Sequence, residues 1–146
     1  VVLASMLDEA LEVVSGLWSG QPFSHHGAYY SFDDVQDLPT PLQQPRIPVW
    51  VSAMARNERT LGRAARWDGV ILGAMTPDGG MEVLPADAVA EVAHRPDAPA
   101  DIVVTAPAGT DPEIYRDTGA TWVLITGWLD ELRDLATQPP PAPSAG

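Results

Sequence analysis

Four short apolar runs alternate with helical segments along this chain, and this alternation restricts the folds that it can adopt. The runs are rich in branched and aromatic side chains: Arg46–Ser52, Gly69–Gly73, Asp101–Ala106 and Thr121–Thr126. Gly69–Gly73 is apolar throughout, which is typical of a strand buried on both faces, as in parallel sheets. Strands that alternate with helices predict an α/β fold with about four parallel strands and right-handed crossovers.

Helical periodicity is clearest near the start of the chain. Between Val2 and Trp18, apolar residues recur every three or four positions, and Ser19-Gly20-Gln21-Pro22 ends the pattern. Four further helices are predicted, the second of them interrupted by Pro85: Asn57–Trp67, Val83–Ala93, Glu113–Thr118 and Leu129–Ala136.

Residues 23–45 are predicted to form an irregular insertion. Gly27, Pro39, Pro41 and Pro45 interrupt any long helix or strand in this segment. A short hairpin around Ala28–Phe32 is the only regular structure that we expect there.

Composition excludes several classes of protein. A chain of 146 residues is long enough to bury one core, and no apolar run approaches the roughly 20 residues that cross a bilayer. Because the chain has no cysteine, it has no disulfide, thiolate nucleophile or cysteine-based metal site. A net charge of −12, with no lysine, argues against nucleic acid as a partner. We therefore expect a cytoplasmic protein that binds neither membranes nor nucleic acid.

The two ends of the chain differ from its middle. The sequence begins Val1-Val2 and enters a helical pattern without the features of a signal peptide, so we expect an internal start. Residues 138–146 are rich in proline and are predicted to be a disordered tail. The predicted folded domain is therefore residues 1–137.

The turn after the first apolar run is the strongest candidate for a binding site. Residues 52–60 place small side chains directly before a helix, where free backbone N–H groups and the helix dipole favour an anion. Five of the eight arginines, but only one acid, Glu58, lie between Arg46 and Arg66. This locally positive stretch in an acidic chain suits a ligand that carries a phosphate.

Helical geometry separates the arginines of this stretch. The predicted core face holds Leu61, Ala64 and Ala65, and the opposite face holds Arg59, Arg63 and Arg66. Arg56 precedes the helix and can reach its N-terminus. An ordinary loop with solvated arginines stays open as the alternative.

Other polar residues give weaker signals. His25-His26 lies in an irregular loop without a carboxylate at helical spacing, and His94 is expected to interact with a helix C-terminus. The acid pairs Asp33-Asp34 and Asp130-Glu131 are most simply solvated charges at a loop and a helix start. No nucleophilic triad, phosphate-binding loop of the Walker type or metal-ligand cluster is visible, so the catalytic residues stay unassigned and no metal site is expected.

Several longer segments together resemble the C-terminal half of the luciferase-like monooxygenases, which are flavin- or deazaflavin (F420)-dependent oxidoreductases. The resemblance reaches from the start of the chain to about Ala136. It is carried by Met6–Gly20, Pro22-Phe23, Gly27, Tyr30, Pro45–Val51, Arg63–Val70 and Gly119–Trp122.

This resemblance implies the C-terminal half of a (β/α)8 TIM barrel, because four strands make only half of eight. It also implies that the turn after the first strand helps to hold the phosphate of the cofactor. The sequence does not show whether this cofactor is FMN or F420. The residues concerned are Ser52, Ala53, Met54, Ala55, Arg56 and Asn57, with Arg59 and Thr60 beside them. The family usually has a Gly-Gly pair where this chain has Ser52-Ala53.

Two functions are compatible with these observations. The first is the cofactor-binding portion of a flavin- or F420-dependent oxidoreductase or monooxygenase that acts on a small molecule, with the isolated chain inactive. The second is a non-catalytic half-barrel that dimerises or binds phosphate. A half-barrel leaves two strand edges unpaired, so we expect either a homo-oligomer or a missing N-terminal half-barrel as its partner.

Overall fold

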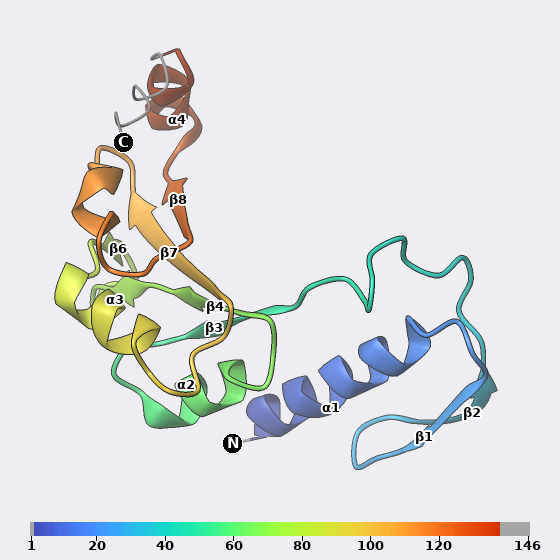
Figure 1. Cartoon of the computed structure of the whole chain (residues 1–146). Coiled ribbons are helices and arrows are strands. Elements are labelled where there is room, and N and C mark those ends of the chain that lie inside the picture. The colour runs from blue at the N-terminus through green and yellow to red at the C-terminus, as the bar shows by residue number, and fades with distance from the viewer. Residues whose placement is uncertain (1, 138–146) are drawn as a thin grey trace. The chain divides into compact units, whose positions relative to one another are not determined.

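A computed structural model describes residues 2–137, which form two units with boundaries at residues 1–48 and 49–146 (Figure 1). The predicted disordered tail at 138–146 lies outside the described residues. None of the described helices is long and apolar enough to cross a membrane.

The first unit consists of one helix and one hairpin. Helix α1 (Val2–Leu17) has the predicted bounds to within one residue. Strands β1 (Phe23–His26) and β2 (Ser31–Val35) pair antiparallel. The predicted hairpin is therefore present, but Ala28–Phe32 covers its turn and the start of β2 rather than both strands. The rings of Phe23 and Phe32 pack edge to face across the hairpin, with centroids 5.8 Å apart.

The second unit contains the predicted parallel sheet. Its strands lie in the order β3 (Trp50–Ala53), β4 (Gly69–Leu72), β7 (Asp101–Pro107) and β8 (Trp122–Thr126), and every neighbouring pair is parallel. Strand β3 begins at Trp50 rather than at the predicted Arg46, because Pro45 and Pro48 cannot donate to a sheet.

Two helices of this unit are shorter than the sequence predicted, one is a 3-10 turn, and one has its predicted bounds. Helix α2 (Glu58–Ala64) begins after its N-cap, Asn57. Helix α3 (Ala86–Ala93) begins after Pro85. The prediction of a helix from Val83 that Pro85 interrupts is therefore wrong. The predicted helix at Glu113–Thr118 is instead a 3-10 turn, η1 (Pro112–Tyr115), which Asp111 caps by accepting the N–H of Glu113. Helix α4 (Leu129–Ala136) has its predicted bounds.

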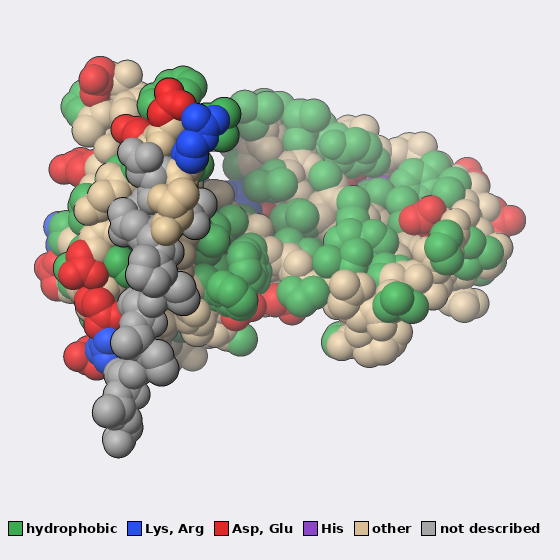
Figure 2. Space-filling model, turned by 90° about the horizontal axis from the view of Figure 1, so that it is seen from above, with side chains coloured by type: hydrophobic (Ala, Val, Ile, Leu, Met, Phe, Trp, Pro, Cys, Tyr) green, Lys and Arg blue, Asp and Glu red, His purple; other side chains and the backbone are tan. Residues whose placement is uncertain are grey.

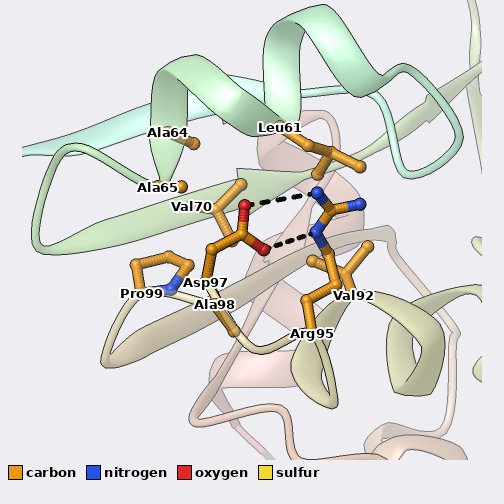
Figure 3. A pocket seen from close by; sticks show the side chains of 9 residues that line it. All are labelled: Leu61, Ala64, Ala65, Val70, Val92, Arg95, Asp97, Ala98 and Pro99. Carbon is orange, nitrogen blue, oxygen red and sulfur yellow. Dashed lines mark hydrogen bonds and ion pairs between the residues drawn. The ribbon is translucent and has the colours of Figure 1, made fainter.

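The core lies between the sheet and its helices. Alternate strand residues such as Val70, Leu72 and Val104 are fully buried. Figure 3 shows Val70 facing Leu61 of α2 and Val92 of α3, with a space of only about 10 Å³ between them, which is the size of one water. The other face of the sheet holds larger apolar side chains at partly exposed positions, including Trp122 and Leu124.

A small hairpin, which was not predicted from the sequence, follows β4. Strands β5 (Ala74–Met75) and β6 (Met81–Glu82) are two residues long and pair antiparallel. The sequence Pro77-Asp78-Gly79-Gly80 forms the connection, and Gly79 has a positive φ of 88°. Asp-Gly between short apolar runs is a hairpin signal that could have revealed it.

Candidate functional site

The carboxyl ends of the parallel strands carry the candidate site, as in α/β barrels in general. Strand β3 ends here, and its residues alternate in direction. Val51 and Ala53 are buried, whereas Ser52 is exposed on the other face. The methyl group of Ala53 therefore lies in the core, and Ser52 is the exposed side chain of this pair.

The turn after β3 satisfies several of its own backbone groups. Asn57 Oδ1 accepts hydrogen bonds from the N–H groups of Arg59 (3.1 Å) and Thr60 (3.3 Å). Thr60 Oγ1 accepts the N–H of Met54 at 3.2 Å and donates to the carbonyl of Asn57 at 3.0 Å. Three N–H groups that could have bound an anion at this helix start therefore already donate to protein oxygens. An anion at the predicted site would thus have to be bound mainly by side chains of the turn, above all by Arg56.

Arg56 lies against acidic residues of α3. Its Nη2 atom is 3.6 Å from Asp87 Oδ2, and its Nε atom is 4.0 Å from Glu91 Oε2. All three side chains are more than 60% exposed. Arg56 belongs to a stretch that is positive in the sequence, but the fold brings two carboxylates of another helix to it. On the face that Figure 2 draws, acidic side chains outnumber basic ones.

A second ion-pair group follows on the same surface. Arg95 Nη1 donates to Glu58 at 2.8 Å. Arg95 Nε donates to Asp97 at 3.0 Å, and Figure 3 shows these two side chains facing each other. The hydrogen bonds from Arg95 lower the pKa of the Asp97 carboxyl, although partial burial opposes this shift. The positive charge of Arg95 is therefore already balanced by two carboxylates.

A cleft of about 390 Å³, here called the methionine cleft, opens beside the turn. Three of the four methionines of the chain line it: Met54, Met75 and Met81. Its other lining residues are Ser52, Ala53, Thr60, Ile71, Gly73, Ala74 and Thr105. None of the ten carries an ionisable side chain. Methionine side chains are flexible and polarisable, so such a surface adapts to apolar ligands.

A second cleft, also of about 390 Å³ and here called the arginine cleft, adjoins the first and shares Met54, Gly73 and Ala74 with it. Its remaining lining residues are Ala55, Arg56, Asn57, Leu84, Pro85 and Ala88. Arg56 is the one charged residue among them. The start of α3 forms one wall, and its N-cap residue, Pro85, makes no side-chain capping bond. Both clefts have volumes typical of small-molecule sites.

The structure brings most of the predicted site residues to these clefts. Seven of the eight line one or both of them: Ser52, Ala53, Met54, Ala55, Arg56, Asn57 and Thr60. Arg59 lies exposed on α2 and lines neither. Residues of the β5–β6 hairpin and of β7 were missed, because they join the clefts only through the fold.

The remaining polar candidates have structural partners. His94 Nδ1 is 2.7 Å from the carbonyl of Ala90, as expected for a residue at the end of α3. His25 Nε2 lies 3.2 Å from Glu9 Oε1, and His26 pairs with Asp33. The part of the chain that the structure describes contains no group of three or more histidine, aspartate or glutamate side chains that could hold a metal.

Four parallel strands in chain order with intervening helices, and clefts at the carboxyl edge of the sheet, are the arrangement of a partial (β/α) barrel. The chain belongs to the luciferase-like monooxygenase family, whose model matches residues 4–116. The resemblance noted from the sequence is thereby confirmed.

Individual relatives match shorter segments. An uncharacterized protein of Mycobacterium tuberculosis (strain ATCC 25618 / H37Rv) is 39% identical over 72 residues, which are 49% of this chain and 24% of the relative. The oxygenase component of a flavin-dependent trigonelline monooxygenase from Acinetobacter baylyi is 37% identical over 51 residues, 35% of this chain and 14% of that protein. An FMNH2-dependent dimethylsulfone monooxygenase from Pseudomonas putida is 31% identical over 61 residues, 41% of this chain and 17% of that protein. The aligned segments thus span no more than 24% of these relatives.

Proposed function

We propose that this chain is the cofactor-binding portion of a flavin- or F420-dependent oxidoreductase that acts on a small molecule. The observation that carries the proposal is the junction of the two clefts. An uncharged, methionine-lined cleft opens into one that carries Arg56, and the two share Met54, Gly73 and Ala74. This pairing fits a ligand that joins an apolar ring system to a phosphate.

The residues present fit such a cofactor. Arg56 would bind the phosphate, and its loose ion pairs with α3 leave it free to turn towards a ligand at small cost, because exposed pairs contribute about 0–1 kcal/mol. Met54 and the hairpin residues Met75 and Met81 would contact the ring system and exclude water from one side of it.

Hydride transfer or oxygen activation is chemistry that a bound flavin or deazaflavin supplies, and the protein positions it. The methionine cleft has no acid or base among its lining residues. Any proton transfer in a reaction there therefore needs groups beyond this cleft. For this reason we propose that the isolated chain binds the cofactor but does not turn over a substrate. A cytoplasmic location is part of the same proposal.

Cofactor titration tests the proposal directly. FMN and F420 are added separately to the chain, and the fluorescence of each is followed. We expect binding, with Arg56→Ala weakening it by about tenfold, which corresponds to the loss of roughly 1.4 kcal/mol. Arg59→Ala is the matched control, because it removes an equal charge from α2 without touching either cleft. If neither compound binds at high micromolar concentration, or both arginine variants behave alike, the proposal is wrong.

The exposed apolar face of the sheet favours a second candidate, a half-barrel whose role is association. Trp122 and Leu124 of β8 are 53% and 38% exposed, and β8 is an edge strand of the described sheet. Unpaired edges and apolar faces promote pairing with another chain. Light scattering at high protein concentration tests this function: a dimer that Trp122→Ser dissociates supports it, and a monodisperse monomer contradicts it.

A further inference from the structure

We infer that Asp87 and Glu91 act as a charge selector at the arginine cleft, so that the site accepts a ligand with a single terminal phosphate and disfavours one that continues into further anionic groups. This inference rests on the proposed function and deepens it. Of the two cofactors considered, it selects FMN over F420.

The geometry places both carboxylates where a ligand phosphate would meet Arg56. Asp87 and Glu91 are four residues apart on α3, so they lie on the same face of that helix. Their distances to Arg56, 3.6 and 4.0 Å, are longer than hydrogen bonds. A phosphate can therefore displace them from Arg56, but they stay close to whatever replaces them.

The surface beyond Arg56 is also acidic. A pocket of about 200 Å³ continues from the arginine along α2 and α3, and its charged lining residues are Arg56, Glu58, Glu91 and Arg95. Arg95 is already hydrogen-bonded to Glu58 and Asp97. In the lining of this pocket, two glutamates balance two arginines. Asp87 and Asp97 pair with the same arginines and add two further negative charges, so a ligand tail that follows this direction meets a net negative surface.

FMN and F420 differ in the part that would lie here. FMN ends in a phosphate monoester, whereas the phosphate of F420 is a diester that leads to a chain of glutamate carboxylates. One phosphate can be matched by Arg56. Each additional carboxylate would face like charges at short range, and like charges a few ångströms apart on a protein surface repel.

The experiment compares FMN, F420 and riboflavin, each titrated by its own fluorescence against three forms of the chain. These are the unmodified protein, Asp87→Asn/Glu91→Gln, and the control Asp117→Asn/Asp130→Asn, which removes the same charge from residues that neither pair with Arg56 nor line the pocket beyond it. We expect FMN to bind the unmodified protein about tenfold or more tightly than F420. The Asp87/Glu91 variant should reduce this ratio to about threefold or less, mainly because F420 binds to it more tightly. The control variant should keep the ratio of the unmodified protein.

The outcomes separate the two proposals. If FMN binds more tightly than riboflavin and depends on Arg56, but the FMN-to-F420 ratio is the same in all three forms, the charge selector is wrong and the proposed function stands. F420 binding to the unmodified protein as tightly as FMN also overturns the selector. If no compound binds, the proposed function and the selector fail together.

Discussion

The carboxylate of Glu9 on α1 accepts the backbone N–H of Tyr30 at 2.7 Å, across a separation of 21 residues. The same carboxylate accepts the N–H groups of Ala28 and Tyr29 at 3.0 Å, and it lies 3.2 Å from His25 Nε2. Gly27 leaves room for this carboxylate, since a Cβ there would lie 1.9 Å from Glu9 Oε1 and would displace it. One side chain therefore organises the whole turn between β1 and β2.

We predict that Glu9→Gln loosens this turn without disrupting the sheet of residues 49–137. An amide oxygen can replace one acceptor, but the amide nitrogen cannot accept a backbone N–H. Hydrogen exchange at the amides of Ala28, Tyr29 and Tyr30 should accelerate, whereas exchange in β4 and β7 should not change. Equal exchange at the turn in both proteins would show that Glu9 does not hold it.

The same contact should make the turn sensitive to acid. Burial raises the pKa of Glu9, but hydrogen bonds from the N–H groups of Tyr30 and Tyr29, from His25 and from Ala28 outweigh it, so its pKa is lowered from 4.5. A lowered pKa means that the stabilisation is fully present above about pH 4.5 and is lost as the pH falls through the folded-state value. The protection of the turn amides, measured relative to their intrinsic exchange rate at each pH, should therefore decrease as the pH falls through the folded-state pKa of Glu9, and Glu9→Gln should remove that dependence.

Asn57 gives a prediction about the turn that borders both clefts. It caps α2 through two backbone N–H groups, and loss of an N-cap costs about 1 kcal/mol. Asn57→Ala should lower the free energy of unfolding by this amount in urea denaturation followed by circular dichroism. Asn57→Asp keeps the accepting oxygen and should cost less. A full loss in Asn57→Asp would show that the cap is not the cause.

The four parallel strands were predictable because each is a short apolar run between helical segments, and this pattern is local in the sequence. It held even for β3 and β8, which expose residues such as Ser52, Trp122 and Leu124. The residue at which each strand begins could not be predicted as well. Pro48 is compatible with the end of a strand, and only the pairing of Trp50 with Gly69 shows where β3 begins. The 3-10 turn at Pro112–Tyr115 was read as a helix because periodicity over four residues does not distinguish the two.

The candidate site was predictable as far as it is local in sequence. Residues 52–57 follow one strand, so a single pattern identified them. The carboxylates that face Arg56 come from α3, and Met75 and Met81 come from a hairpin that is held by two-residue strands. Such contacts depend on which strands are neighbours. For the same reason, the sequence indicated a positive stretch around Arg56, whereas in the folded protein carboxylates of α3 balance the charge of this arginine.

Tyr115 is the largest fully buried side chain, and its hydroxyl donates to the carbonyl of Leu84 at 2.8 Å. Tyr115→Phe leaves that carbonyl without this donor and should cost about 1 kcal/mol of unfolding free energy. Burial raises the pKa of Tyr115 from 10.0. A raised pKa favours the neutral phenol, so stability should fall as the pH rises above about 10, and the phenylalanine variant should lose this slope. Urea denaturation at pH 8 and pH 10.5 measures both effects.

Gly69 allows the tryptophan cluster at the start of the sheet to form. Trp50 and Trp122 lie with ring centroids 6.0 Å apart, and their indole N–H groups donate to Asp101 at 3.0 and 3.4 Å. A Cβ at Gly69 would lie 2.4 Å from Trp50 Cδ1 and 2.8 Å from Asp101 Cβ, so the ring must move.

Gly69→Ala should therefore destabilise the second unit by about 1–3 kcal/mol, the usual cost of overpacking, and should shift the tryptophan fluorescence. Gly62→Ala is the matched control, since nothing lies within 4 Å of the added methyl group. Because Gly62 is inside α2, alanine there should stabilise the unit by up to about 1 kcal/mol. Opposite signs of the two changes in urea denaturation are expected; a neutral Gly69→Ala would show that the tryptophan cluster can repack without loss.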